Sequence, residues 1–386
     1  MKFLTVIAAL FIATGLFAQE NYKTNHPVSE YTNVETHKAV AIDNAKRFAA
    51  KPKRVIFLIG DGMGVAHLYS GYTANKGNLN VFQMPYVGFS ITYSANNYIT
   101  DSAAGGTALA AGVKTTNGTI GMDANGKPVQ SILHLSENKG LATGLVSTSS
   151  ITHATPASFI AHVASRGSYE DIALDFLQTD IDVFIGGGRK HFEQRADGRN
   201  LSEELKKKGY KVAYSLKDVA STNTSRMAVL TADEHNGKST ERGDMLPQAT
   251  TKAIEVLKNN KKGFFLMVEG SQIDWGGHQN DAAYVVGEML DFDIAVGKAL
   301  EFAANDKNTL VIVTADHETG GMSLVGGNIP NGQVKASFNS PDHTAEMVPV
   351  FAYGAGAEKF AGVYQNIDIF KKLAELMEVG TTSRKR

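Results

Sequence analysis

The chain has 386 residues, of which 43% are hydrophobic and 20% are charged, and it contains 38 glycines. This composition is typical of a globular protein with one large domain or two smaller ones. The formal net charge of -1 provides no basic field that would attract a polyanion, which excludes nucleic-acid binding as a main role.

The N-terminus has the pattern of an export signal. Met1 and Lys2 form a short basic start, residues 3–17 are apolar, and Ala18 precedes polar residues. Because the apolar run is too short to cross a bilayer, we expect a signal peptide over 1–18, cleaved near Ala18, rather than a membrane anchor. The mature protein is then periplasmic or secreted, without a membrane span. The chain has no cysteine, so neither disulfides nor a lipid-modified cysteine can form.

Apolar runs of the kind that form strands buried on both faces recur along the chain. Residues 19–50 precede them and are polar without a clear period, which indicates an N-terminal arm with at most one short helix. The expected strands cover 54–60, 141–147, 183–186, 264–269, 310–316 and 348–354, and the expected helices between them include 250–259 and 282–304.

Alternating buried strands and helices predict an α/β fold, a three-layer sandwich with a large, mostly parallel central sheet flanked by helices. We expect residues 51–386 to form a single domain. The segment 189–246 is more polar and includes a triplet of lysines. It indicates a peripheral insertion that carries structure rather than chemistry.

The run from Thr100 to Gly112 places Ser102 where an irregular segment gives way to an alanine-rich helix. A hydroxyl at a helix N-terminus meets unpaired backbone N–H groups and the positive end of the helix dipole, which stabilise negative charge. An Asp101-Ser102 pair before a helix is also a common cap without any chemistry. The acids and histidines elsewhere in the chain favour the chemical interpretation.

Acids and histidines follow the carboxyl ends of several expected strands, where ligands bind in open α/β sheets. These residues are Asp61, Glu269, Asp316 and His317, and His343 lies just before the last expected strand, 348–354. Asp274 and His278 are four residues apart, so on a helical turn they share a face and can chelate one ion, although such a pair alone is more often an incidental surface pair. Three histidines with several carboxylates suit zinc, and the remaining acids with Thr155 suit magnesium.

The segment from His153 to Arg166 has the pattern of a helix start followed by a cation. Pro156 fits the first helical turn, with Thr155 as the N-cap. Arg166 is then expected about three turns later, near the helix C-terminus, where it is either a partner of the helix dipole or a bidentate clamp on a phosphate.

Six segments resemble, in order, the signature blocks of the alkaline phosphatase family. They are 60–64, 100–112, 155–157 with Arg166, 268–270, 314–321 and 343–346, and together they span nearly the whole mature chain. The resemblance implies the family's fold and the hydrolysis of phosphate monoesters to alcohol and inorganic phosphate through a phosphoserine. It also implies a homodimer.

The resemblance implies a role for each matching residue. Ser102 would attack phosphorus, Asp101 would orient it, and Arg166 would bind the phosphate. One Zn²⁺ would be held by Asp274, His278 and His343, and a second Zn²⁺ by Asp61, Asp316 and His317. Asp61, Thr155 and Glu269 would form a third site for Mg²⁺. Two such zinc ions activate the attacking oxygen and stabilise the leaving oxygen.

Two positions depart from the best-known bacterial member of the family. His153 and Trp275 stand where that enzyme has an aspartate and a lysine, and we expect both near the bound substrate. Because Trp275 stands in place of the lysine, a cation near the phosphate is missing. His153 in place of the aspartate changes the surroundings of the third metal, so Co²⁺ or a third Zn²⁺ is an alternative to Mg²⁺ there. Without chemistry, His153 would be a helix-start residue and Trp275 a rim aromatic.

Three alternatives to a phosphomonoesterase remain at this point. A sulfatase of the same superfamily needs a C/S-x-P-x-R context, whereas Ser102 is followed by Ala-Ala-Gly-Gly. A phosphodiesterase relative often uses threonine as its nucleophile. A non-catalytic phosphate- or metal-binding periplasmic protein needs no nucleophile at all.

Overall fold

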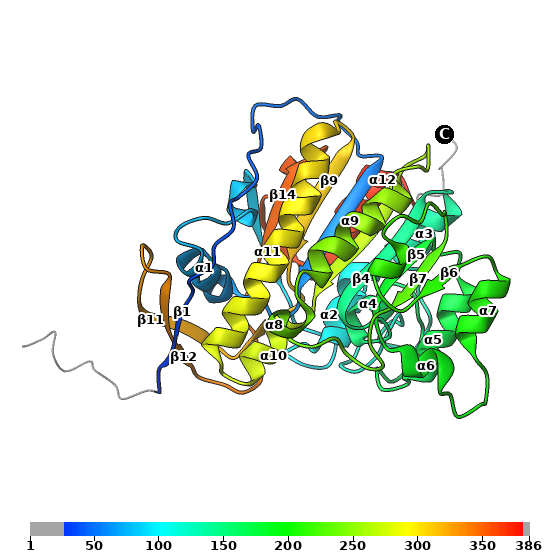
Figure 1. The fold of residues 1–386 in the computed structure, drawn as a ribbon, viewed down its shortest axis with the longest axis horizontal. Helices are drawn as coiled ribbons and strands as arrows, with labels where there is room; N and C mark the ends of the chain where they lie inside the picture. The colour runs from blue at the N-terminus through cyan, green and yellow to red at the C-terminus, as the bar shows by residue number, and fades with distance from the viewer. Residues whose placement is uncertain (1–26, 381–386) are drawn as a thin grey trace, which may run out of the picture.

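A ten-stranded sheet runs through the centre of the molecule, and helices cover both of its faces (Figure 1). The computed structural model describes residues 27–380, so the expected signal peptide over 1–18 lies outside the described residues. In order across the sheet, the strands are β15 (Gly362–Gln365), β3 (Tyr86–Ile91), β14 (Val348–Gly354), β9 (Thr309–Thr314), β2 (Arg54–Gly60), β8 (Phe264–Gly270), β4 (Ala142–Ser150), β5 (Val183–Gly187), β7 (Met227–Leu230) and β6 (Lys211–Ala213).

The sheet is mostly parallel, as the sequence predicts. Only β14 runs antiparallel to its neighbours β3 and β9, while the other neighbouring pairs are parallel. The parallel register pairs Ile59 of β2 with Glu269 of β8 and with Thr314 of β9. The carboxyl ends of these central strands therefore meet at one edge of the sheet, where an open α/β sheet binds its ligands.

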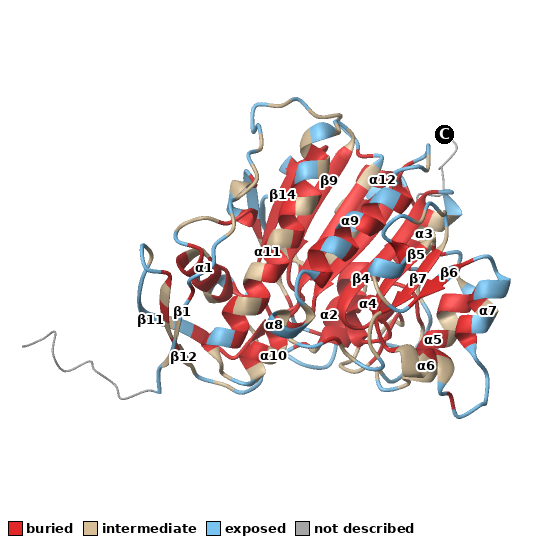
Figure 2. Cartoon of the chain, in the orientation of Figure 1, coloured by how far each residue is buried: buried red, intermediate tan, exposed pale blue. Residues whose placement is uncertain are grey.

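Successive residues of the central strand β2 face two different helical layers. Val55, Phe57 and Ile59 belong to one buried apolar cluster, and Ile56 and Leu58 belong to the other. Because side chains alternate along a strand, a continuous apolar run buries both faces of the sheet. Figure 2 shows the central strands buried, with exposed positions on the outer faces of the helices and along the loops.

The helices form two layers around the sheet. One layer holds α9 (Met245–Leu257) and α11 (Ala282–Asn305). The other holds α2 (Ser102–Ala111), α3 (Ile132–Asn138), α4 (Ala154–Ala157), α5 (Tyr169–Gln178), α7 (Leu201–Lys207) and α12 (Asn366–Met377). The remaining helical segments are α1 (Val65–Ala74), α6 (Arg189–Glu193), α8 (Ser239–Arg242), α10 (Gln272–His278) and the 3₁₀ turns η1 (Val81–Gln83), η2 (Lys217–Val219) and η3 (Ala357–Phe360). Within residues 27–380, none of these helices combines the length and apolar character needed to cross a membrane.

The helix expected over 250–259 begins earlier, at Met245. Pro247 lies in its first turn, where a missing N–H group breaks no intrahelical hydrogen bond, so the helix extends across it. The helix expected over 282–304 matches α11 almost residue for residue.

The described part of the N-terminal arm holds a short strand, where the sequence indicated at most one short helix. β1 (Ser29–Thr32) pairs antiparallel with β12 (Gln333–Phe338), which in turn pairs with β11 (Met322–Asn328). Exposure alternates along β1, and Tyr31 packs against the small apolar clusters beneath it, which is the period of a strand. A second small sheet pairs β10 (Glu318–Thr319) with β13 (His343–Thr344).

The polar segment 189–246 contributes α6, α7, α8 and the last two strands at one side of the main sheet, β7 and β6. Strand β7 is parallel to β5, so its carboxyl end points to the same edge of the sheet as β2, β8 and β9. The loop that follows β7 therefore reaches that edge as well.

Candidate active site

Ser102 is the first residue of α2, and Asp101 caps this helix. The Oδ1 atom of Asp101 accepts a hydrogen bond from the backbone N–H of Ala104 at 3.0 Å. Ser102 is buried, and its Oγ lies 3.3 Å from Nε2 of His317. The hydroxyl thus stands at the positive end of a ten-residue helix, beside a group of acids and histidines.

Two glycines of α2 explain how the helix comes so close to the strand ends. A Cβ atom at Gly105 would lie 3.1 Å from Cβ of Asp316, and one at Gly106 would lie 2.8 Å from Oγ of Ser158. The glycines let α2 pack directly against these residues. The sequence Ser-Ala-Ala-Gly-Gly therefore starts the helix and, through its two glycines, also brings the Ser102 hydroxyl close to the strand ends.

Arg166 reaches the site from a loop, not from the end of a helix. Its Nη1 lies 3.0 Å from Oδ2 of Asp101 and its Nη2 lies 3.3 Å from Nε2 of His153. Burial lowers the pKa of Arg166, but the charge and hydrogen bond of Asp101 outweigh burial and raise it above its ordinary value. The guanidinium is therefore charged and held by its two neighbours.

The helix that we expected to run from Thr155 to Arg166 is much shorter. α4 ends at Ala157, and its N-cap is His153, so Thr155 lies inside the first turn. The Oγ of Ser158 bonds back to the carbonyl of Ala154 at 2.8 Å, and the chain then extends to pair Val163 with Ile120. That pairing replaces the helix, and the backbone N–H of Arg166 donates to the carbonyl of Gly118.

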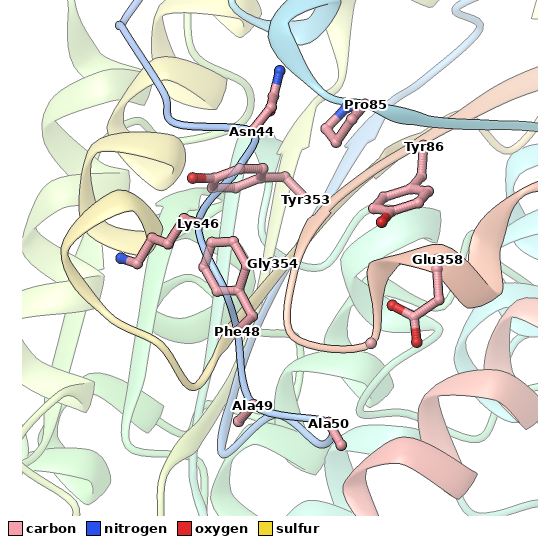
Figure 3. Close-up of a pocket in the computed structure, with 11 residues that line it drawn as sticks. Asn44, Lys46, Phe48, Ala49, Ala50, Pro85, Tyr86, Tyr353, Gly354 and Glu358 are labelled. Carbon is pink, nitrogen blue, oxygen red and sulfur yellow. The ribbon is translucent and has the colours of Figure 1, made fainter.

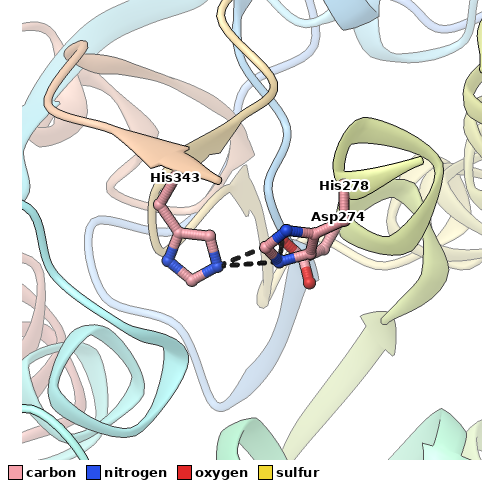
Figure 4. Close-up of side chains that lie close together, drawn as sticks. All are labelled: Asp274, His278 and His343. Atoms are coloured by element: carbon pink, nitrogen blue, oxygen red, sulfur yellow. Dashed lines mark hydrogen bonds and ion pairs between the residues drawn. The ribbon is translucent and has the colours of Figure 1, made fainter. Parts of the chain in front are cut away.

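Asp274, His278 and His343 form the first candidate metal group (Figure 4). Nε2 of each histidine lies 3.4 Å from Oδ1 of Asp274, and the two Nε2 atoms are 3.2 Å apart. Nδ1 of His278 bonds the carbonyl of Pro341 and Nδ1 of His343 bonds that of Thr100, which turns both Nε2 atoms toward one point. The hydrogen bond to the Asp274 carboxylate raises the pKa of His278 to about 9, because the nearby negative charge favours the protonated imidazole.

Asp61, Asp316 and His317 lie together, fully buried, beside the first group. Nε2 of His317 is 3.4 Å from Oδ1 of Asp61 and 3.3 Å from Oδ2 of Asp316. Burial and the charge of Asp316 raise the pKa of Asp61 well above its ordinary value, and burial with the charge of Asp274 raises that of Asp316 to about 7. Asp274 also belongs to a compact group with Asp61 and His317, so the two sites adjoin.

A third group joins Asp61, Glu269 and His153. We expected Thr155 in this place, and its Oγ1 does lie 3.4 Å from Oδ2 of Asp61. The hydroxyl of Ser147 donates to Oε2 of Glu269 at 2.7 Å, so Oε1 is left free. Burial lowers the pKa of His153 to about 3, which keeps its imidazole neutral and able to bind a metal.

These three groups fit divalent cations. Within the described residues, several of their buried polar atoms lack a hydrogen-bond partner: Oδ1 of Asp61, Oδ2 of Asp316, Oε1 of Glu269 and Nδ1 of His153. Unpaired buried carboxylates are costly unless they are neutralised or coordinate a metal. The mixture of imidazole and carboxylate ligands suits zinc in the first two groups, and the carboxylate-rich third group suits a harder ion.

Trp275, which we expected near the substrate, lies on α10 beside His153 of this third group. Its ring centroid is 6.2 Å from that of His153. His235 is a neighbour that we did not predict, since it has no spacing relationship to the other site residues. Its one sequence signal is its place in the segment that follows the carboxyl end of β7, five residues after the strand ends.

A separate cavity of about 220 Å³ lies at the opposite end of the sheet (Figure 3). It is lined by residues such as Phe48, Tyr353 and Glu358, and Gly354 in its wall pairs with Leu310 at the start of β9. None of the site residues contributes to it.

Comparisons with known proteins agree with this geometry. A family model described as alkaline phosphatase matches residues 52–337. Alkaline phosphatase 4 of Bacillus subtilis is 34% identical to the chain, and the match covers 98% of this chain and 97% of the relative. Alkaline phosphatase 3 of the same organism is 42% identical, and the match covers 81% of this chain and 71% of the relative. The structure of alkaline phosphatase from the Antarctic bacterium TAB5 superposes with a TM-score of 0.82 at 40% identity, covering 86% of this chain and 100% of that one.

Proposed function

The chain belongs to the alkaline phosphatase family of phosphoric monoester hydrolases, and from this premise we propose which residues carry the reaction. Ser102 is the nucleophile, Arg166 binds the phosphate, and Asp101 orients both. The observation that carries the proposal is the position of Ser102 Oγ, at a helix N-terminus and 3.3 Å from Nε2 of His317.

We assign the metal ions on which the family's chemistry depends to the three candidate metal groups described above. Asp274, His278 and His343 would hold one zinc ion, and Asp61, Asp316 and His317 a second. Asp61, Thr155 and Glu269, with His153 beside them, would hold magnesium. Variants of the TAB5 enzyme in which a histidine is replaced by aspartate or by glutamate have been solved with magnesium in a site called M3, so a relative binds magnesium there when a carboxylate replaces that histidine. When bound, such ions lower the pKa of a hydroxyl or water and stabilise charge that develops on oxygen.

The chain's own residues then position the reaction. Arg166 presents two parallel N–H groups to two phosphate oxygens, a geometry that matches the guanidinium fork. The Oγ of Ser102 attacks phosphorus, an Oγ–P bond forms, and the P–O bond to the alcohol breaks in line with it. The departing oxygen takes up a proton and leaves as the alcohol. Water then attacks phosphorus, the Oγ–P bond breaks, inorganic phosphate leaves, and Oγ regains a proton.

Metal analysis of the purified protein, alongside hydrolysis of a simple aryl phosphate before and after chelation, tests this proposal. We expect activity that follows metal content and returns when zinc and magnesium are restored. Activity that survives complete metal removal would contradict the assignment of the ligand groups.

Export and assembly are also part of the proposal. A signal peptide over 1–18 would deliver the mature protein to the periplasm or the medium, and N-terminal sequencing of the mature protein checks this. The mature protein would also form a homodimer, and light scattering of the purified protein checks this.

A further inference from the structure

His235 lies in the loop between β7 and α8, beside the site, and none of the steps above uses it. Its imidazole packs edge to face against Trp275, with ring centroids 4.9 Å apart at 82°. It packs in the same way against His153, at 5.6 Å and 90°. Its Nδ1 accepts a hydrogen bond from the backbone N–H of Ser150 at 3.0 Å, so the neutral ring carries its proton on Nε2.

The loop that carries His235 is anchored to the same strand end and helix as its partners. The side chain of Asn236 donates to the carbonyl of Thr148 in β4 at 3.2 Å. Gln272, the first residue of the helix that carries Trp275, donates to the carbonyl of Asn236 at 2.8 Å. The imidazole therefore sits at a fixed place relative to Trp275.

A glycine in β5 makes this close approach possible. A Cβ atom at Gly187 would lie 2.1 Å from the carbonyl oxygen of Glu234, a distance that no side chain tolerates. The absence of a side chain at position 187 lets the loop pass directly against the sheet. His235 is therefore brought to the site by the packing of the strand beside it.

The contacts of His235 continue to the phosphate-binding cation. His153, which His235 and Trp275 both pack against, has its Nε2 3.3 Å from Nη2 of Arg166. A ring held in place by its neighbours keeps this atom aimed at the guanidinium. Removal of one of the three rings leaves space into which the other two can turn.

We propose that His235 is a positioning residue for phosphate binding: it holds Trp275 and His153 in place, and through His153 it sets the orientation of Arg166. The proposal rests on the proposed function only for the role of Arg166. The packing of Trp275 can be measured without any substrate, so failure of the two proposals can be told apart.

Trp275 is the single tryptophan of the chain, which makes its fluorescence a direct report on this packing. In the metal-loaded His235→Ala variant we expect a red shift of the emission and faster quenching by acrylamide. Calorimetric titration with inorganic phosphate should show a dissociation constant raised by about threefold to tenfold, the scale set by the loss of an edge-to-face ring pair. KM for an aryl phosphate should rise in parallel, with kcat changed by less than about twofold.

Two further variants make the test specific. His235→Phe keeps a flat ring and loses only the hydrogen bond from Ser150, so its Trp275 emission should lie close to that of the wild type. His191→Ala is a matched control, because His191 is also a partly buried histidine stacked on an aromatic ring, that of Tyr169, at 4.7 Å. We expect it to change neither the fluorescence of Trp275 nor the affinity for phosphate.

The proposal is overturned if folded His235→Ala keeps the emission, the quenching and the phosphate affinity of the wild type. It is also overturned if His191→Ala weakens phosphate binding to the same extent. Should His235→Ala fail to fold by circular dichroism, His235→Phe decides: native emission supports the packing role, and a red-shifted emission contradicts it. A wild type that neither binds nor hydrolyses phosphate would contradict the proposed function while leaving the fluorescence comparison intact.

Discussion

The Nη1 atom of Arg166 lies 3.0 Å from Oδ2 of Asp101, the residue that caps the helix on which Ser102 stands. One carboxylate thus serves two purposes, since its other oxygen accepts the backbone N–H of Ala104. The proposed nucleophile, Ser102, and the proposed phosphate-binding cation, Arg166, are therefore joined through a single side chain. A shift of either one would be transmitted to the other.

Replacing Arg166 should mainly weaken the binding of phosphate. Arg166→Ala removes two charge-assisted donors, each of which contributes about 1.5–3 kcal/mol, so kcat/KM should fall by roughly 10²–10⁴-fold. Arg166→Lys keeps the positive charge but loses the planar guanidinium fork, so its kcat/KM should lie between those of the wild type and of Arg166→Ala. Steady-state kinetics and the inhibition constant of inorganic phosphate check this order. Equal inhibition constants in the wild type and in Arg166→Ala would contradict the assigned role.

Chelation should destabilise the protein as well as inactivate it. Asp61, Glu269, Asp274 and Asp316 are buried at one end of the sheet, and without metal ions their charges repel one another. A site filled at 1,000 times its dissociation constant adds about 4 kcal/mol of stability, so losing two such sites should lower Tm by at least about 5 °C. Scanning calorimetry before and after treatment with a chelator measures the change.

Asp61→Asn provides the matched control for chelation, because it removes one of the repelling charges. After chelation, this variant should melt at a higher temperature than the chelated wild type, while metal addition should stabilise it less. An unchanged Tm of the wild type after complete metal removal would show that these carboxylates are not metal ligands.

The close packing of α2 predicts that an alanine at position 106 impairs the enzyme. Alanine is the better helix former by about 1 kcal/mol, yet its Cβ would lie 2.8 Å from Oγ of Ser158. We expect Gly106→Ala to displace α2 and to lower kcat. Ser158→Ala in the same chain removes that contact, so the double variant should regain part of the lost kcat. A Gly106→Ala enzyme with wild-type kcat would contradict the idea that this glycine positions Ser102.

Glu137, at the end of α3, should make the protein less stable at alkaline pH. Burial raises the pKa of this carboxyl to about 7 in the folded chain, above the ordinary 4.5. Its stabilising contribution is therefore complete below pH 4.5 and is lost as the pH rises through 7. The raised pKa corresponds to at most about 3 kcal/mol in the free energy of unfolding. Because Glu137 is partly exposed, we expect a pH-dependent change in that free energy of about 1–2 kcal/mol.

Urea unfolding at pH 4.5 and pH 9 tests this pH dependence. Glu137→Gln should resemble the wild type at the lower pH and be more stable than the wild type at the higher pH. Glu358→Gln, at an exposed position, serves as the control and should show no such difference. A Glu137→Gln variant whose stability gain is the same at both pH values would contradict the assignment.

The central strands could be predicted from sequence because they are buried on both faces. Residues 55–59 are apolar without interruption, and β2 forms over the expected residues 54–60. The last two strands at one side of the sheet, β15 and its neighbour β3, could not be predicted in the same way. Residues 86–91 in β3 mix exposed and buried positions, residues 362–365 in β15 are exposed or half-buried, and their pairing depends on partners far away in the chain.

That the candidate-site residues lie together could be predicted where they directly follow such strands or lie four residues apart on a helix. Asp274 and His278 do share a face of α10, as their spacing indicates. Arg166 was placed on the wrong element, because the pairing of Val163 with Ile120 is a long-range contact that overrides the local helical pattern. His235 was missed because only the order of strands across the sheet brings its loop to the site.

The most direct test of the account is a rapid acid quench of the metal-loaded enzyme during hydrolysis of an aryl phosphate, followed by peptide mass analysis, for the wild type and Ser102→Ala. The account predicts a phosphoryl group on the wild-type peptide that contains Ser102. In Ser102→Ala that phosphopeptide should be absent, since the nucleophile is lost. The activity of this variant should be at most about a hundredth of the wild-type activity. Metal-dependent hydrolysis by Ser102→Ala at the wild-type rate would contradict the account.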